Sequence, residues 1–157
     1  MGDMSGQDRV ETVYRAVHPR LWRSLLSYTG DVEMASDAEA EAFAQVLQRG
    51  DAVEDVAAWV WRSAFRIATG LLAARSRPND VRPADGSTPP TDSVAEFLDL
   101  LAELSPQQRA CVALRYVGAY TSPEIGELLG TSAGTVRVQL HRAHATLRHT
   151  IKEDEHA

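Results

Sequence analysis

The sequence contains almost no cysteine and no long apolar stretch. Its single cysteine, Cys111, cannot form an internal disulfide, and its neighbours Val112 and Leu114 indicate a packed core position. No apolar run reaches the roughly 20 residues that a membrane-spanning helix needs. The opening residues, MGDMSGQDRVE, lack the basic and then apolar order of a signal peptide. We therefore expect a cytoplasmic protein without a membrane span.

The sequence also lacks the residue groupings that enzymes and metal sites require. Its five histidines are His18, His141, His144, His149 and His156. Most of them fall in one basic segment, where no cysteine or carboxylate is expected to complete a metal shell or a nucleophile–base pair with them. We therefore expect no catalytic residue, no metal and no cofactor, and a small helical enzyme is the weakest interpretation.

Alternation of apolar and polar residues, the pattern typical of strands, is absent as well. Apolar residues instead recur at helical spacing in several segments. Residues 78–92, PNDVRPADGSTPPTD, contain four prolines and almost nothing apolar to bury, which is typical of a flexible linker. We predict an all-α protein with two small helical domains, residues 1–77 and 93–157, on either side of that linker.

Three helices are predicted before the linker, over residues 7–27, 34–48 and 55–75. Pro19 interrupts the first of them, so a kink or a break into two segments is expected there. After the linker, a helix is predicted over residues 94–104, and another follows it directly.

The final stretch, residues 120–152, predicts two helices joined by a tight turn. Ser122 and Pro123 open the first helix as its cap and its first helical residue. Gly130 ends it, because glycine accepts the left-handed conformation that closes a helix. A cap at Thr131 or Ser132 then begins a longer helix.

That longer helix separates apolar from basic residues. Its buried face is predicted at Val136, Leu140, Ala143, Leu147 and Ile151. Its opposite face carries Arg137, His141, Arg142, His144 and Arg148. Acidic residues are absent from position 128 through 152, although the chain as a whole has a net charge of −6. The pattern favours a DNA-binding helix-turn-helix over an ordinary helical hairpin with a solvated basic face.

Several motifs in this half form a recognisable set. They are Leu104-Ser105-Pro106-Gln107-Gln108-Arg109, Glu124-Ile125-Gly126, Leu129-Gly130-Thr131-Ser132, Gly134-Thr135-Val136-Arg137 and Leu140-His141-Arg142-Ala143. Together they closely resemble region four of bacterial RNA polymerase sigma factors, and the extracytoplasmic-function (ECF) subfamily is the best match. The N-terminal half is similar to region two of the same family, at Tyr14, His18-Pro19-Arg20-Leu21, Gly30-Asp31, Glu41-Ala42-Phe43 and Trp59 to Arg62.

The resemblance implies that the C-terminal domain binds the duplex −35 element of a promoter. Candidate residues are Ser122, Thr131, Thr135, Arg137, Val138, Gln139, His141 and Arg142. Arginine can donate two hydrogen bonds to a guanine edge, so Arg137 and Arg142 are expected to read bases. Ser122, Thr131 and Thr135 are better placed for phosphates. Arg142 and Arg148 have an equally good interpretation as phosphate-facing or solvated charges.

By the same resemblance, the N-terminal domain would hold the melted strand of the −10 element. Candidate residues are Arg62, Arg66, Trp61, Arg75 and Arg77, since a single strand needs cations and a stacking surface. Trp59 and Trp61 cannot share a helix face, and Trp59 is expected to be the core residue.

Asp37, Glu39 and Glu41 are candidates for binding the polymerase, a role that the resemblance implies; a solvated acidic face is the alternative. The implied partners are core RNA polymerase, promoter DNA and an anti-sigma factor, and the free chain is expected to be a monomer. The alternative function is a stand-alone helix-turn-helix regulator, which would bind duplex sites without polymerase.

Overall fold

The computed structural model describes residues 5–75 and 92–156, and within these ranges it contains helices and turns but no strand. The first part has α1 (Gly6–Thr29), α2 (Val32–Arg49), a short 3-10 turn η1 (Gly50–Ala52) and α3 (Val56–Arg75). The second part has α4 (Asp92–Ala102), α5 (Pro106–Val112), a π turn η2 (Ala113–Val117), α6 (Ser122–Leu129) and α7 (Ala133–His156). The all-α prediction is confirmed, while the predicted linker lies outside the described residues except for Asp92.

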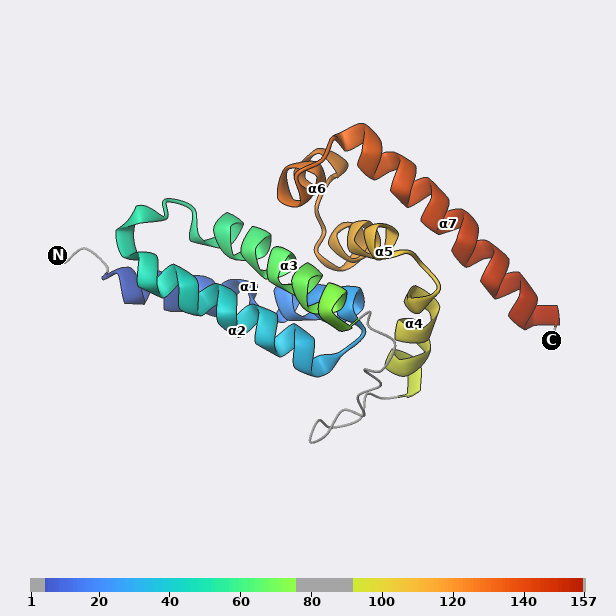
Figure 1. Ribbon diagram of the computed structural model, residues 1–157, viewed down its shortest axis with the longest axis horizontal. Coiled ribbons are helices and arrows are strands. Elements are labelled where there is room, and N and C mark those ends of the chain that lie inside the picture. The colour runs from blue at the N-terminus through green and yellow to red at the C-terminus, as the bar shows by residue number, and fades with distance from the viewer. Residues whose placement is uncertain (1–4, 76–91, 157) are drawn as a thin grey trace.

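The first three helices form a bundle in which each contacts the other two (Figure 1). Leu21 and Leu25 of α1, Val46 of α2 and Val60 of α3 are fully buried at its centre. Of the two outcomes expected at Pro19, a kink or a break, the break is absent, because α1 is a single helix with Pro19 inside it. Packing of the apolar face along the whole of α1 outweighs the one backbone hydrogen bond that proline removes.

The second part ends in the predicted helix-turn-helix. Thr121, and not Ser122, caps α6: its side chain accepts from the Glu124 N–H, while the Glu124 carboxylate accepts from the Thr121 N–H. Gly130 ends α6 with a φ of 74°, in the left-handed region that favours glycine. Ser132 accepts from the Thr135 N–H at 3.1 Å and begins α7. The cap therefore stands one residue earlier than predicted on α6.

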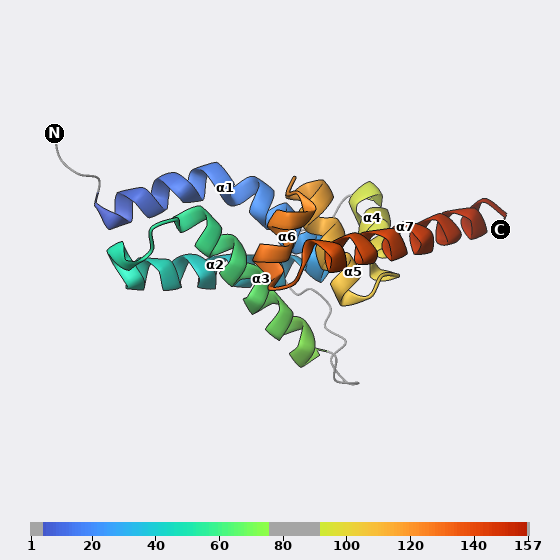
Figure 2. The ribbon, with the colours of Figure 1, turned by 90° about the horizontal axis from the view of Figure 1, so that it is seen from above.

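The two parts pack directly against each other. α1 contacts α5 and η2, and α3 contacts α6, so the helix-turn-helix lies against the bundle in both views (Figures 1 and 2). The buried residues of both parts belong to one continuous apolar cluster. α7 extends away from this junction toward the far end of the molecule (Figure 2). The structure is therefore a closed arrangement of two helical parts.

The turn between α6 and α7 depends on the absence of a side chain at Gly126. A Cβ atom there would lie 2.7 Å from the Thr131 carbonyl oxygen and 3.1 Å from the Ser132 carbonyl carbon. The Thr131 N–H also donates to the Gly126 carbonyl at 2.8 Å, which fixes this close approach. Only glycine fits without moving the turn.

We predict that Gly126→Ala lowers the free energy of unfolding by about 1–3 kcal/mol, the usual cost of overpacking. Gly134→Ala is the matched control, because a Cβ there meets only the Ser132 Oγ at 3.8 Å. The control should be neutral or stabilising by up to ~1 kcal/mol, through helix propensity. Urea unfolding of both variants checks this; equal effects of the two substitutions would contradict it.

Candidate nucleic-acid interface

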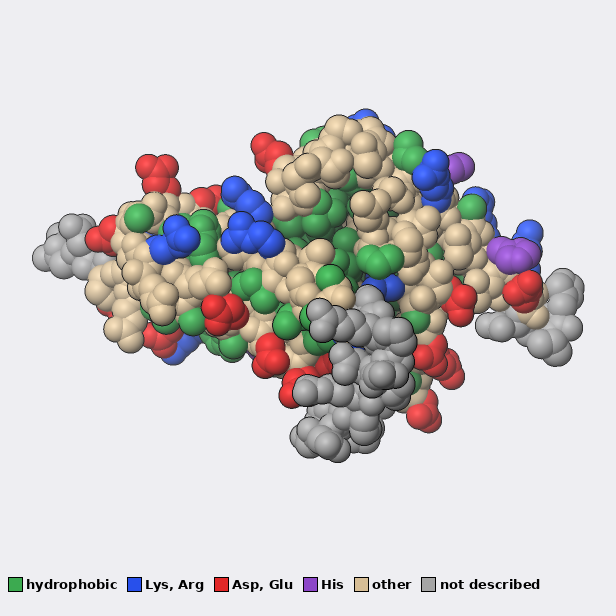
Figure 3. Space-filling view, in the orientation of Figure 1, with side chains coloured by type: hydrophobic (Ala, Val, Ile, Leu, Met, Phe, Trp, Pro, Cys, Tyr) green, Lys and Arg blue, Asp and Glu red, His purple; other side chains and the backbone are tan. Residues whose placement is uncertain are grey.

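α7 presents its basic residues to solvent, as its sequence pattern predicts. Val136, Leu140 and Ala143 are buried, whereas Leu147 is half-buried and Ile151 is exposed. The exposed residues of the opposite face are Arg137, His141, Arg142, His144 and Arg148. Lys and Arg side chains accordingly follow the edge of the molecule that α7 occupies (Figure 3). The helix thus has one anchored face and one free cationic face.

The start of α7 brings several other predicted residues onto the same surface. Thr131, Thr135 and Val138 are exposed, and Val138 keeps 47% of its surface accessible. Gln139 is half-buried and donates to the Gln107 side chain of α5 at 3.1 Å. Ser122 is half-buried at the start of α6. The predicted −35 residues therefore lie at the turn and the first three turns of α7, apart from Ser122.

The arginines of α3 differ in availability. Arg62 and Arg66 are exposed. Arg75 forms an ion pair with Asp31, with 2.9 Å between Nη1 and Oδ2, which joins the end of α3 to the start of α2. Arg77 lies outside the described residues. Two cations of the predicted strand-binding set are therefore free on α3, and a third has a carboxylate partner.

The prediction for the two tryptophans of α3 is wrong. Trp61 is 1% exposed, whereas Trp59 is only partly buried and has the Arg49 guanidinium over its ring. Trp61 packs inward because the second helical part covers it, which the periodicity of α3 alone does not reveal. Trp61 is therefore not a DNA-facing residue in this structure.

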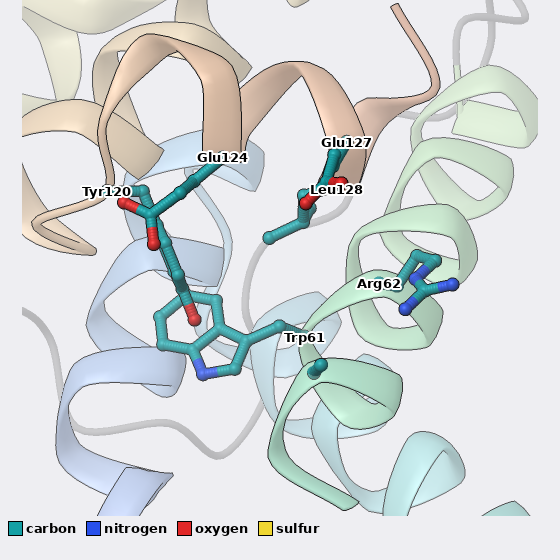
Figure 4. A pocket seen from close by; sticks show the side chains of 7 residues that line it. Trp61, Arg62, Tyr120, Glu124, Glu127 and Leu128 are labelled. Carbon is teal, nitrogen blue, oxygen red and sulfur yellow. The ribbon is translucent and has the colours of Figure 1, made fainter. Parts of the chain in front are cut away.

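Three residues from different elements meet at Trp61, and we name this group the Trp61 junction: Trp61 of α3, Tyr120 before α6 and Arg20 of α1. The Tyr120 ring meets Trp61 edge-on, with 5.0 Å between centroids (Figure 4). The Arg20 guanidinium lies 5.7 Å from the Trp61 ring and 5.9 Å from the Tyr120 ring. Burial raises the pKa of the Tyr120 phenol, and Arg20 opposes that rise. The junction joins the bundle to the helix-turn-helix.

A second contact between the two parts involves Arg109 of α5. Its Nε donates to the Tyr28 carbonyl at the end of α1, at 2.5 Å, and its Nη1 donates to the Leu104 carbonyl at 3.2 Å. The guanidinium also lies over the Tyr28 ring. Burial lowers the pKa of Arg109, and Tyr28 acts in the opposite direction. A half-buried cation thus satisfies backbone carbonyls that the closed arrangement covers.

The acidic residues of α2 do not form one exposed set. Asp37 and Glu41 are exposed one turn apart, but Glu39 is only 5% exposed, so its prediction as a docking residue is wrong. Glu39 Oε1 lies 2.6 Å from His18 Nδ1 of α1, and its Oε2 has no hydrogen-bond partner in the described residues. Burial raises the pKa of Glu39, and the contact with His18 lowers it to a smaller extent.

The described residues also bear on the expectations for metal binding, histidine pairing, the cysteine and a membrane span. No group of three or more His, Cys, Asp or Glu side chains in them could hold a metal ion. His149 does have a carboxylate partner, contrary to expectation, in the exposed ion pair with Glu153. Cys111 is buried, as predicted, and burial raises the pKa of its thiol to about 11. None of the described helices has the length and apolar character that a bilayer crossing requires.

Residues 95–147 match the family model described as sigma-70, region 4. The ECF RNA polymerase sigma factor SigL of Mycobacterium tuberculosis is 30% identical over 151 residues, which cover 85% of this chain and 83% of SigL. The chain belongs to the ECF RNA polymerase sigma factors. The RNA polymerase sigma-E factor of Streptomyces coelicolor is similar too, with 31% identity over 90% of this chain and 85% of that protein.

Two solved structures share the fold of this sigma factor. RpoE of Bartonella quintana, in complex with the anti-sigma factor NepR, has a TM-score of 0.76 at 18% identity, covering 90% of this chain and 96% of RpoE. CnrH, in complex with the cytosolic domain of CnrY, has a TM-score of 0.68 at 19% identity over 94% of this chain and 90% of CnrH. At this identity the likeness concerns the fold alone.

The contacts between the two parts of this sigma factor are what the sequence did not reveal. In the sequence, Tyr120 is the first residue of the predicted helix-turn-helix stretch, and Tyr28 falls between two predicted helices. Their partners, Trp61 and Arg109, lie 59 and 81 residues away in the chain. Local sequence patterns do not identify such pairs, because the pattern around each residue is already explained by a helix or a turn in its own segment.

We predict that Glu39 makes the stability of this sigma factor depend on pH. A raised pKa means that the folded chain binds this proton more tightly than the unfolded chain, so the contribution is lost as pH rises through the pKa. The free energy of unfolding of the wild type, minus that of Glu39→Gln, should therefore fall between about pH 4 and pH 7. Urea unfolding across that range measures it; a constant or rising difference would contradict the prediction.

Proposed function

We propose that this ECF sigma factor binds core RNA polymerase and places two cationic surfaces on different stretches of one promoter. Residues 93–157 would bind the duplex −35 element, and residues 1–77 would hold the melted −10 strand, with residues 78–92 as the linker. The observation that carries the proposal is the face of α7, where Arg137, His141 and Arg142 are exposed above a buried apolar face.

Duplex recognition would proceed by insertion of the start of α7 into the major groove. Arg137 stands in the first turns of the helix and Arg142 stands further along it, so both can reach base edges. His141, Gln139 and Val138 would contact neighbouring edges, with Val138 packing on a thymine methyl. Thr131, Thr135 and Ser122 would donate to phosphates, which fix the register of the protein on the duplex.

Strand binding would rest on the cations of α3. Arg62 and Arg66 are exposed there and would contact the backbone of an unpaired strand. Arg75 would join them only by giving up its ion pair with Asp31, and Arg77 is proposed from its sequence position. Trp61 is left out of this surface, because it is buried in the closed arrangement.

Asp37 and Glu41 are proposed as the polymerase-binding residues, since both carboxylates are exposed on α2. An anti-sigma factor is a proposed partner, which the complex of RpoE with NepR supports by likeness of fold. The free chain would be a monomer. A dimeric regulator binds two half-sites with two copies of one recognition helix, whereas this chain would use two different DNA-binding surfaces of its own. A protein with this role would act in the cytoplasm and not as an enzyme.

Run-off transcription tests the proposal. Genomic DNA fragments would be transcribed by core RNA polymerase with and without the chain, and defined transcripts should appear only when both are present. A stand-alone regulator gives a different result: the chain would bind duplex sites tightly without polymerase and would direct no transcript. That outcome would overturn the proposed function.

We predict that Arg137→Ala relaxes discrimination at one upstream base pair, by about 1–3 kcal/mol, because a two-bond contact to guanine is lost. Transcription from promoters that vary at each upstream position measures the effect. Arg148→Ala, three turns further along α7, is the comparison, and it should weaken all sequences alike. Equal weakening on every sequence by Arg137→Ala would show that Arg137 contacts only phosphate.

A further inference from the structure

The π turn η2 holds two exposed side chains in a fixed position between α5 and α6. The Gly118 N–H donates to the Ala113 carbonyl at 2.9 Å, five residues earlier, which is the π-helical spacing. The residues left exposed within the turn are Arg115 and Tyr116. The Arg115 guanidinium is tied to the Tyr120 carbonyl at 3.2 Å. Turns of this kind are rare and often occur at functional sites, which directs attention to Tyr116.

Tyr116 is more exposed than packing alone explains. It keeps 59% of its surface accessible, more than any other large hydrophobic side chain in the described part of the chain. Its hydroxyl lies 2.7 Å from His144 Nε2 of α7, and the two ring centroids are 5.7 Å apart. An exposed hydrogen bond adds little to stability, because water competes for both groups. The contact instead fixes the orientation of both side chains at the surface, and we name them the Tyr116–His144 pair.

The Tyr116–His144 pair lies at the edge of the cationic face of α7. Residues three or four apart share a helix face, so His144 continues the line of Arg137, His141 and Arg148. Lys, Arg and His side chains gather along the edge that α7 occupies (Figure 3). The surface hollow on this side of the helix is lined by His141, His144, Leu147, Arg148 and Ile151. The pair therefore borders a surface that already attracts negative charge.

The position of His144 along α7 matches the level of the DNA backbone. An α-helix rises 1.5 Å per residue, so His144 lies about 10 Å beyond Arg137 along the helix axis. The major groove is about 12 Å wide. When Arg137 reaches base edges in the groove, a side chain two turns further along reaches the wall of the groove, where the phosphates lie. No acidic residue stands between them, since α7 has none before Glu153.

The chemistry of the pair suits a phosphate oxygen. If His144 Nε2–H donates in the 2.7 Å contact, the Tyr116 hydroxyl hydrogen remains free; if the hydroxyl donates, His144 keeps Nδ1–H. In both cases the pair retains a donor beyond its internal hydrogen bond. Tyrosine hydroxyls and other side-chain donors are common partners of phosphate oxygens in protein–DNA complexes.

We propose that the Tyr116–His144 pair is a further phosphate-binding site of the −35 interface. In this site η2 and α7 together hold one backbone phosphate beside the residues that read bases. The inference rests on the proposed function, because it deepens the duplex-binding surface named there. A phosphate contact fixes the register of α7 on the duplex and adds affinity, and it carries no preference for a base.

Tyr116→Phe tests the site in the full chain assembled with core polymerase. The variant keeps the ring and removes the hydroxyl, so the fold should be unchanged. Binding to a fluorescein-labelled promoter duplex should weaken about three- to tenfold, the effect of one lost hydrogen bond. The factor should be the same on promoters that vary at each upstream base pair. A loss confined to particular base pairs would overturn the phosphate contact, as would a Tyr116→Phe variant that binds like the wild type.

A second variant and its control test the partner of Tyr116. His144→Ala should weaken binding about as much as Tyr116→Phe, and the double variant should weaken it by less than the product of the two factors, because both remove one contact. His149→Ala is the matched control, since His149 is also exposed on α7 but pairs with Glu153. It should bind like the wild type. Equal losses from His144→Ala and His149→Ala would overturn the assignment.

Neutral methylphosphonates, placed at one backbone position at a time beside the −35 element, identify the phosphate. Wild-type binding should weaken at the position that the pair contacts, and Tyr116→Phe should no longer respond to the substitution there. A Tyr116→Phe variant that responds like the wild type at every position would overturn the inference.

Run-off transcription separates this inference from the proposed function. A wild type that directs transcripts, with Tyr116→Phe and His144→Ala equal to it in promoter binding, leaves the sigma-factor role in place and removes the phosphate site alone. A wild type that directs no transcript overturns the role, and the inference with it.

Discussion

Packing between two small helical parts is the constraint on which the rest of this structure depends. Each part alone has few residues with which to build a core, and domains of this size bury a smaller fraction of their surface than larger ones. Contact between α3 and α6, and between α1 and α5, extends both cores into one cluster. As a consequence, Trp61 and Arg109 are engaged inside the protein, whereas Arg62 and Arg66 of α3 stay exposed.

Charge placement shows why an acidic protein can still belong to a DNA-binding family. The chain carries a net charge of −6, yet acidic residues are absent from 56 through 79 and from 128 through 152. Both segments include a helix with exposed arginines, α3 and α7. Negative charge elsewhere in the chain lowers the non-specific attraction to DNA, while the basic faces of α3 and α7 still attract DNA locally. Specific binding would then depend on holding both faces on one promoter, which is what a polymerase can do.

Local features of the sequence predicted most of the fold and the exposure of the basic face of α7. Helical spacing and turn residues such as Gly130 and Ser132 act within a few positions, so α6 and α7 and their faces followed from the sequence. The inward turn of Trp61 and the burial of Glu39 did not, because each depends on a partner from another element: Tyr120 for Trp61 and His18 for Glu39. Pro19 is a third case in which the local sequence was insufficient. Packing against other helices keeps α1 continuous through a residue that breaks isolated helices.

Footprinting of the complex with core polymerase on a responsive promoter tests the central claim most directly, that one chain places two surfaces on two stretches of DNA. Hydroxyl-radical cleavage should show an upstream duplex stretch protected by the helix-turn-helix part. Permanganate should react with thymines in a separate downstream stretch, where the strands are open. A single protected duplex stretch, with no reactive thymines downstream, would contradict the account.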